Sequence, residues 1–435
     1  MFRVQIRLVA ALAAVALAAT GCGLGGSDDK DTTSGAVTGE VKGEVSFLTL
    51  SLKPKFTDYI QGMIDEFQKL HPGTTVKWID LPPDGYQQKI LADAAAGTMP
   101  DVVNIGADNA LPMSRQGLLL NNETALPGAK GDYTPGSWQA YEIPGKGGNY
   151  GLPWYLTTGG NFINKSLLQQ AGVDPNQTPR TFGEFKDFGM RIAKASEGKV
   201  WALSAKPGLV DLALHGVKVM NDDGTKFTFN TPEGVQALQD YVDLFKAGAM
   251  PPDALTRDGA KSNTDFLAGK IALVPGSASF LTEIKQNAPT LYPNVAIAPQ
   301  LTNTGHSNMY ILGLSVYAKS KNKRTALELA HFVTNPANQT KFAKIVTVFP
   351  SSPKSYDDPF FSTARAERNA DEEKYRIEMG KQIKDAVSYT PAQFSDRMSK
   401  VFEREVGLAM MGSKSAKDAL DTAVADCNQL LTAGS

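Results

Sequence analysis

Few side chains in this sequence are spaced as they are in known catalytic motifs. The chain has no G-x-S-x-G nucleophile elbow, no Walker-type phosphate loop, no G-x-G-x-x-G and no H-E-x-x-H. Its two cysteines, Cys22 and Cys427, lie near opposite ends, and its four histidines are scattered. These patterns exclude a disulfide framework and a four-cysteine zinc site and disfavour a histidine-rich metal site, so we expect no metal and no cofactor.

Two glycine-containing segments look superficially like ligand loops. Residues 145–148 (GKGG) lack the spacing and the Lys-Ser/Thr ending of a phosphate loop, and residues 221–224 (NDDG) lack the ligand spacing and terminal Glu of a calcium loop. We interpret the second as a tight turn. Paired carboxylates of a glycoside hydrolase stay open as an alternative, because 45 acidic residues offer many pairs and sequence spacing does not fix their separation.

Size and charge narrow the function classes. The chain has 435 residues, with 44 Lys and Arg against 45 Asp and Glu, for a net charge of -1. A single core stops growing at roughly 250–300 residues, so two lobes are expected. Near-neutrality removes a general electrostatic attraction to nucleic acid, and we expect no nucleic-acid partner.

The N-terminus has the pattern of an export signal. Arg3 and Arg7 precede an apolar run over residues 8–19, which is too short to span a bilayer that needs about 20 residues. Residues 19–22 (ATGC) resemble a bacterial lipobox, in which the chain is cut before the cysteine and the cysteine is lipidated, although Ala stands where Leu is usual. We therefore predict a signal peptide over 1–21, a lipidated Cys22, and a flexible tether over 22–42. An ordinary small-residue cleavage site is the alternative.

The periodicity predicts an α/β fold. Strands are expected at 45–50, 75–81 and 101–105, with helices at 60–70 and 86–94 between them, which is the order of a parallel sheet. Thr181 with Glu184 and Thr231 with Pro232 open two further helices. Residues 121–150 carry little periodicity and are expected to form a crossover or exposed loops. Cys427 lies on the apolar stripe of a C-terminal helix and is expected to be buried.

The loop after the strand at 101–105 is a candidate binding segment. Ligands of open α/β sheets bind at the carboxyl ends of strands, and Asp108 and Asn109 follow one directly. Both are candidate partners for ligand hydroxyls, with helix N-capping as the structural alternative. Asp101 is interpreted as structural.

Short segments in a fixed order resemble the bacterial extracellular solute-binding proteins that are sugar-binding, maltose-binding-protein-like receptors of ABC importers. They cover nearly the whole mature chain: FQKLHPG at 67–73, YQQK at 86–89, AGTMPDVV at 96–103, GLL at 117–119, YGLPW at 150–154, NK at 164–165, AGV at 171–173, PRTF at 179–182, FLAGK at 266–270, and the helix from Gly412 to Leu420.

The resemblance implies a two-lobed, type II periplasmic-binding-protein-like fold with the ligand cleft between lobes joined by a multi-strand hinge. It implies chain crossings near Leu120, Gly313 and Tyr356. Lobe 1 is then expected over 43–120 plus 314–356, and lobe 2 over 121–313 plus 357–435.

The resemblance also implies ligand contacts. A sugar presents an apolar C–H face and a rim of hydroxyls, so it needs aromatic platforms and polar partners. Trp154 is a candidate platform, with a core position as its alternative, and Thr157 follows in an expected loop. Trp201 is a second candidate platform. Ser277, Phe280, Tyr310 and Arg397 fall where the family places contacts, although Ser277 and Arg397 replace the aromatics usual there.

The expected function is that of a non-enzymatic, lipid-anchored receptor that captures a sugar or oligosaccharide and delivers it to a permease with its ATPase. A monomer at the outer face of the bacterial cytoplasmic membrane is expected. Arg397 leaves open a phosphodiester or other anionic ligand, because a guanidinium binds phosphate or carboxylate in two-point fashion. A secreted glycan-processing enzyme is the remaining alternative.

Overall fold

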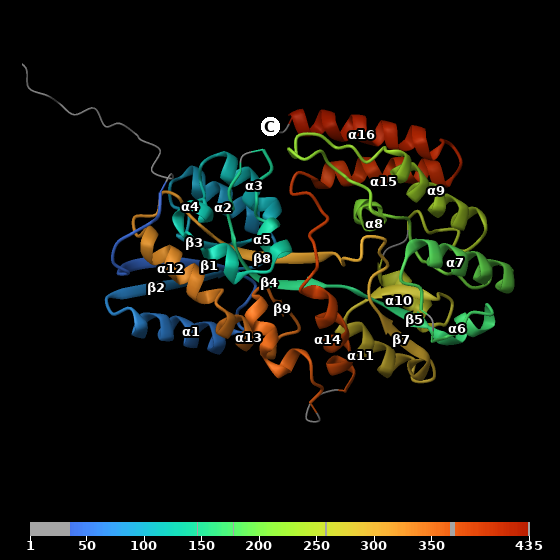
Figure 1. The fold of residues 1–435 in the computed structure, drawn as a ribbon, viewed down its shortest axis with the longest axis horizontal. Coiled ribbons are helices and arrows are strands. Elements are labelled where there is room, and N and C mark those ends of the chain that lie inside the picture. The colour runs from blue at the N-terminus through green and yellow to red at the C-terminus, as the bar shows by residue number, and fades with distance from the viewer. Residues whose placement is uncertain (1–34, 146, 177, 257–258, 366–369, 434–435) are drawn as a thin grey trace, which may run out of the picture.

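The computed structural model describes residues 35–145, 147–176, 178–256, 259–365 and 370–433. They form two lobes side by side (Figure 1), one containing β1 to β3 and the other containing α15 and α16. Strands β4 and β8 run from the first lobe toward the second. The predicted signal peptide and Cys22 lie outside the described residues.

Lobe 1 is built on a six-stranded mixed sheet. The strand order is β2-β1-β3-β8-β4-β9, with β1 to β3 parallel and β8, β4 and β9 joined antiparallel. The parallel part matches the strand-helix-strand pattern of the sequence. The strands are β1 (Gly43–Leu50), β2 (Thr74–Leu81), β3 (Val102–Ile105), β4 (Leu152–Thr158), β8 (Met309–Val316) and β9 (Phe349–Pro350).

Helices cover both faces of this sheet. One core contains the apolar stripes of α1 and α12 together with Phe342 of α13, and the other contains those of α2 and α3. Strand residues alternate between the two cores, as the period of two requires: Phe47 lies in the first and Leu48 in the second. The helices are α1 (Thr57–Leu70), α2 (Tyr86–Ala95), α3 (Ala107–Arg115), α12 (Lys323–Val333) and α13 (Pro336–Ile345).

Residues 121–151 belong to lobe 1, so the predicted first crossing near Leu120 is wrong. Trp138 packs in the core with α1, and Tyr141 packs in the core with α2 and α3. This segment forms short helices that the sequence pattern does not reveal, because each has one turn or little more: α4 (Asn122–Ala125), η1 (Ala129–Asp132) and α5 (Pro135–Gln139). The chain first leaves lobe 1 between β4 and β5.

Lobe 2 is built around a three-stranded antiparallel sheet in the order β6-β5-β7, with strands β5 (Gly160–Asn164), β6 (Leu273–Gly276) and β7 (Val295–Ala298). One face packs on a helical core that includes the predicted buried Cys427 on α16, and burial raises the pKa of its thiol to about 12. The other face packs on α11 and α14. The remaining elements are α6 (Lys165–Gln170), α7 (Phe182–Ser196), α8 (Leu209–Leu214), α9 (Pro232–Lys246), α10 (Gly259–Leu267), α11 (Ala278–Asn287), η2 (Tyr292–Asn294), η3 (Pro353–Asp357), η4 (Pro359–Phe361), α14 (Ala370–Ile383), α15 (Asp396–Met410) and α16 (Ala416–Ala433).

Three segments form the hinge. The chain passes from β4 to β5 across Gly159, returns into β8 through residues 307–309, and enters lobe 2 again between β9 and α14. Residues 384–395, which join α14 to α15 within lobe 2, pair in parallel with the second of these segments, because Met309 N donates to Val387 O at 3.0 Å and Val387 N donates to Ser307 O at 3.0 Å. Lobe movement is therefore confined to a rotation about this bundle of backbone.

The end of the expected tether is docked on lobe 1 instead of being free. Val37 N donates to Ala125 O at 3.0 Å, and the side chains of Val37 and Val41 pack against the lobe 1 core. Lys42 N donates to Thr325 Oγ1 at 2.9 Å. The two valines supply the apolar surface that a Gly/Ser-rich tether lacks. In the described part of the chain, no helix is long and apolar enough to cross a membrane.

Candidate functional site

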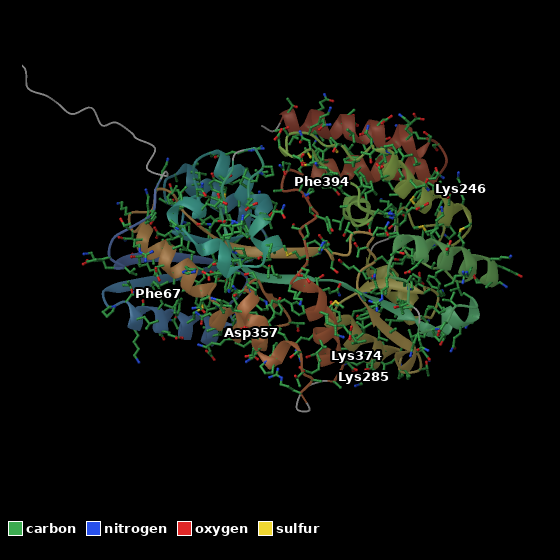
Figure 2. The ribbon with its side chains drawn as sticks, in the orientation of Figure 1. Phe67, Lys246, Lys285, Asp357, Lys374 and Phe394 are labelled. Atoms are coloured by element: carbon green, nitrogen blue, oxygen red, sulfur yellow. The ribbon has the colours of Figure 1, made fainter. Side chains whose placement is uncertain are left out.

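Two adjoining cavities lie between the lobes. The inner cavity, of about 490 Å³, lies over the hinge strands, and the outer cavity, of about 640 Å³, lies between α3 and the α15–α16 pair. They share Asp108, Ala392, Phe394 and Asp396, and so form one interlobe cleft. Both volumes are in the range of small-molecule sites. Phe394 lies at the lobe 2 side of this boundary, just before α15 (Figure 2).

Strands β4 and β8 form the floor of the inner cavity. Thr157 and Tyr310 are direct cross-strand partners, and Tyr155 pairs with Leu312 in the same ladder. Residues two apart on a strand share a face, so Tyr155 and Thr157 both point into the cleft. Tyr310 has 59% of its side-chain surface exposed, which is unusual for a large aromatic residue. The predicted contacts Thr157 and Tyr310 therefore meet on this floor.

Tyr155 is held in its phenol form, because burial raises its pKa well above the usual range. Tyr155 Oη donates to Asn104 Oδ1 at 3.3 Å, and the Asn104 amide donates to Gly313 O at 3.0 Å. This network fixes the Tyr155 ring beside β3.

The two walls carry charges of both signs. Asp108 on α3 lines both cavities, as the position after β3 predicts, and Arg115 on the same helix lines the outer cavity. Opposite them, Asp396 and Arg397 begin α15. All four side chains are exposed, and in the described part of the chain neither arginine is recorded in an ion pair. Polar groups of both lobes are thus available to a molecule in the cleft.

Trp154 does not line the cleft, so its prediction as a stacking platform is wrong in this conformation. Its side chain is 0% exposed and lies in the lobe 1 core, stacked on Phe342 at a centroid distance of 5.5 Å and tilted against Phe47 at 6.3 Å. The predicted loop at this position is strand β4, and its period of two points Trp154 away from the face that carries Tyr155.

Phe280 is also a core residue. It is 4% exposed and packs against Phe162 and Phe266 beneath the small sheet, so it presents no face to a ligand. Ser277 is the N-cap of α11, where its hydroxyl accepts a hydrogen bond from Phe280 N at 3.4 Å. A helix cap that satisfies an otherwise unpaired amide accounts for this serine.

Trp201 and Asn109 line neither cavity. Trp201 bridges to Ile271 in parallel and packs partly against the core below the small sheet. Asn109 lies in the first turn of α3, and its buried Oδ1 has no hydrogen-bond partner in the described part of the structure. Asp108, Thr157, Tyr310 and Arg397 are thus the predicted contacts that the fold brings together.

Four aromatic or charged lining residues were absent from the prediction: Tyr155, Phe394, Arg115 and Asp396. Two of them sit beside a predicted residue, Tyr155 after Trp154 and Asp396 before Arg397. The period of strand β4 could have separated Tyr155 from Trp154, but only once the strand itself was recognised. No local pattern identifies Phe394 or Arg115.

Among the described residues, no group of three or more His, Cys, Asp or Glu side chains is placed to hold a metal ion. The chemistry of the cleft is that of reversible recognition, with aromatic faces, hydroxyls, carboxylates and guanidinium groups open to a small polar molecule.

Known proteins resemble this chain in sequence and in fold. A model of the bacterial extracellular solute-binding protein family matches residues 53–340. The chain belongs to this family. A solved structure described as a putative oligosaccharide periplasmic-binding protein from Synechococcus sp. MITs9220 superposes with a TM-score of 0.78 and 28% identity, over 89% of this chain and 99% of that one.

Proteins similar in sequence to this chain include a solute-binding protein and a lipoprotein. A mannitol-binding protein of Pseudomonas aeruginosa is 27% identical over 64% of this chain and 66% of its own length. An uncharacterized lipoprotein of Streptomyces antibioticus is 25% identical over 83% of this chain and 80% of its own length. The protein is therefore a solute-binding protein of the type that serves ABC transporters, with the two-lobed type II fold, and its family consists of substrate-binding proteins.

Proposed function

We propose that this solute-binding protein captures a neutral carbohydrate or alditol between its lobes and delivers it to a membrane permease. The observation that carries the proposal is the floor of the inner cavity, where the exposed ring of Tyr310 stands beside the hydroxyl of its strand partner Thr157. An aromatic face next to hydrogen-bonding groups complements the C–H face and hydroxyl rim of a sugar.

The charges that line the inner cavity favour an uncharged ligand over an anion. Among the described residues, Asp108 and Asp396 are the charged side chains that line it, and no lysine or arginine does. Carboxylates accept hydrogen bonds from ligand hydroxyls but repel a ligand anion. The oligosaccharide and the mannitol in the names of the two relatives described above belong to the same polyhydroxylated class.

The test is a melting-temperature screen of the purified protein against monosaccharides, disaccharides, oligosaccharides and alditols, followed by calorimetry. A ligand at 100 times its Kd adds about 2.7 kcal/mol of stability, which raises the melting temperature measurably. Tyr310→Ala should weaken binding at least tenfold, whereas Met411→Ala, which removes an equally exposed side chain from the end of α15, should not change it. A panel that never raises the melting temperature contradicts the proposal.

The outer cavity favours a second candidate, an anionic solute. Arg115 and Arg397 line it from opposite lobes, and paired guanidinium groups recognise phosphate or carboxylate. Arg397→Ala separates the two candidates. An anion receptor should lose most of its affinity, and a receptor for a neutral sugar should lose much less.

We also propose that the mature protein is a monomer held at the outer face of the cytoplasmic membrane by a lipid on Cys22. The lipobox-like segment before Cys22 and the lipoprotein among the relatives support this anchor. The mass of the purified N-terminal peptide tests it, because lipidation of Cys22 adds fatty-acyl mass. A peptide that begins at another residue without added mass contradicts the anchor.

A further inference from the structure

A run of basic residues lies on lobe 1, away from the ligand cleft. Residues 319–324 (KSKNKR) connect β8 to the start of α12, and we name this segment the basic turn. It contains three lysines and one arginine and no acidic residue. None of its side chains lines either cavity of the cleft, so binding of a ligand there does not account for it.

The strand pairing places the basic turn at one edge of the large sheet. Strands β1, β2 and β3 are parallel and begin at this edge, and β8, which is antiparallel to β3, ends there. The ligand cleft lies at the opposite edge, where β3 ends and β8 begins. The edge that carries the basic turn is named the distal edge. It faces away from lobe 2, on the side marked by Phe67 near the end of α1 (Figure 2).

Alternate residues hold the basic turn against the sheet. Ser320 is 6% exposed, and its Oγ donates to Asp101 Oδ1 at 2.6 Å. Asn322 Nδ2 donates to Glu44 O at 2.7 Å, and Asn322 N donates to Ser320 Oγ at 3.1 Å. The lysines alternate with these two polar residues, so the bonds that fix the turn direct the lysines away from the sheet.

The three lysines of the basic turn are Lys319, Lys321 and Lys323, and none is recorded in an ion pair with another described residue. The carboxylates around them each have partners already: Glu40 with Lys42, Glu44 with Lys77, Glu328 with Arg324, and Asp101 with two serine hydroxyls. The distal edge is therefore left with a net positive charge that the described part of the protein does not neutralise.

Helix α1 ends at the same edge with one basic and one apolar side chain in solvent. Leu70 is 59% exposed, and Lys69 beside it is exposed without a recorded ion pair among the described residues. An apolar side chain among lysines suits the surface of a bilayer, where basic groups contact lipid phosphates and apolar groups reach the acyl boundary.

The N-terminal strap (residues 37–42) lies beside the basic turn. Lys42 N donates to Thr325 Oγ1 at 2.9 Å, and Thr325 Oγ1 donates to Lys42 O at 2.7 Å. Thr325 is the residue that follows the basic turn. Further along the strap, Val37 N donates to Ala125 O at 3.0 Å. The strap that leads toward Cys22 is thus fastened to lobe 1 next to the basic turn.

The length of chain before the strap limits the distance to Cys22. Twelve residues separate Cys22 from Gly35, the first described residue. An extended chain spans at most roughly 3.5 Å per residue, so Cys22 lies within about 45 Å of Gly35, which is about the diameter of one lobe. A membrane anchor at Cys22 would therefore keep lipid headgroups at a high effective concentration around the distal edge.

We propose that the distal edge docks on the headgroups of an anionic phospholipid membrane and orients the anchored receptor. The inference rests on the proposed anchor at Cys22, which brings this edge to the membrane. Each lysine near an anionic surface strengthens binding about fivefold, so the three lysines of the basic turn contribute about a hundredfold. The lipid retains the receptor, the lysines fix which side faces the bilayer, and the cleft at the opposite edge stays accessible from solution.

The test supplies the anchor chemically. The mature chain, beginning at Cys22 and made without its lipid, is coupled through the Cys22 thiol to a maleimide lipid in vesicles, while Cys427 is fully buried. The vesicles contain either equal parts of phosphatidylglycerol and phosphatidylcholine or phosphatidylcholine alone. Acetylation of lysines, measured by mass spectrometry, reports which side chains the bilayer covers. On the anionic vesicles, the lysines of the basic turn and Lys69 should react severalfold more slowly than on the neutral vesicles.

Matched variants assign the effect to the basic turn. The triple variant Lys319→Gln, Lys321→Gln, Lys323→Gln should abolish the protection of Lys69 on anionic vesicles. The control changes the net charge equally at three exposed lobe 2 lysines without a recorded ion pair in the described structure, and should leave that protection intact: Lys194→Gln, Lys226→Gln, Lys246→Gln. Raising the salt from about 0.1 to 1 M shortens the Debye length from about 10 to 3 Å and should remove the protection.

Two results overturn the proposal. One is equal acetylation of the basic turn on anionic and neutral vesicles, which, if both are slower than for the protein in solution, identifies another copy of the receptor as the covering surface. The other is protection of Lys69 that persists in the triple variant. Because Cys22 is coupled chemically, neither result depends on lipidation in the cell, which the mass of the native N-terminal peptide tests separately.

Discussion

Replacing Trp154 distinguishes a core position from a ligand platform. The indole is 0% exposed, and three aromatic rings surround it, those of Phe47, Tyr155 and Phe342, at centroid distances between 5.1 and 6.3 Å. A buried aromatic residue replaced by alanine costs about 4 kcal/mol, because transfer energy and packing are both lost. For a lobe of this size, that loss lowers the melting temperature by roughly 10 °C.

Trp154→Phe should be much milder, with a cost of about 1.5 kcal/mol. The indole Nε1 has no hydrogen-bond partner in the described structure, so phenylalanine gives up no polar contact. Chemical denaturation measures both variants, and calorimetry with a ligand from the sugar screen measures their binding. Because Trp154 forms no part of the cleft lining, the folded fraction of each variant should bind within about twofold of the native affinity.

The opposite result would refute this reasoning. If Trp154→Ala melted at the native temperature but lost binding, the ring would have to contact the ligand in a conformation different from the one described. Trp78→Ala is the control, since Trp78 is partly exposed on β2 and remote from the cleft, and its replacement should lower stability less and leave binding unchanged.

Three further outcomes are expected. His215 is half-buried, and desolvation, partly offset by Asp240, lowers its pKa to about 4, so the folded state holds it neutral. Stability should fall by up to about 3 kcal/mol between pH 6.5 and 4 because of this group, and thermal melts of His215→Phe should show a smaller fall over the same range. Asp101 accepts hydrogen bonds from both the amide and the hydroxyl of Ser46 across β1 and β3, and Asp101→Asn should cost about 2 kcal/mol in urea denaturation without changing ligand affinity. Cys22→Ser should release the protein from membranes into the medium, as fractionation and immunoblotting would detect.

Regular elements were predictable because their local signals are redundant. The helix that begins after Thr181 has a complete capping box with Glu184 and an apolar stripe, and both features appear in the structure. Strand β3 is buried throughout, and β1 buries Val45, Phe47 and Leu48. Each of these signals lies within a few residues, so no knowledge of the rest of the fold was needed.

The lobe boundary was not predictable in the same way. Residues 121–151 have no strong periodicity, and what assigns them to lobe 1 is burial of single side chains such as Trp138 and Tyr141 among strands distant in sequence. Similarly, the choice between Trp154 and Tyr155 as the residue facing the cleft depends on the register of β4 against β8. Register is a tertiary property, and a shift of one residue exchanges the two faces.

The candidate binding residues on the floor of the cleft lie next to the hinge, whereas those on its walls lie on helices of the two lobes. Thr157 and Tyr310 lie one or two residues from the points where β4 and β8 leave the large sheet, so a rotation of the lobes moves them little. Asp108 lies on α3 and Arg397 on α15, on opposite walls of the cleft. Under the proposed function, a ligand stacked on Tyr310 would keep that contact while the lobes rotate and would gain contacts with both walls on closure. Since a ligand shifts a conformational equilibrium only by its difference in affinity between the two states, contacts with the walls would then drive closure, and the floor would hold the ligand while closure occurs.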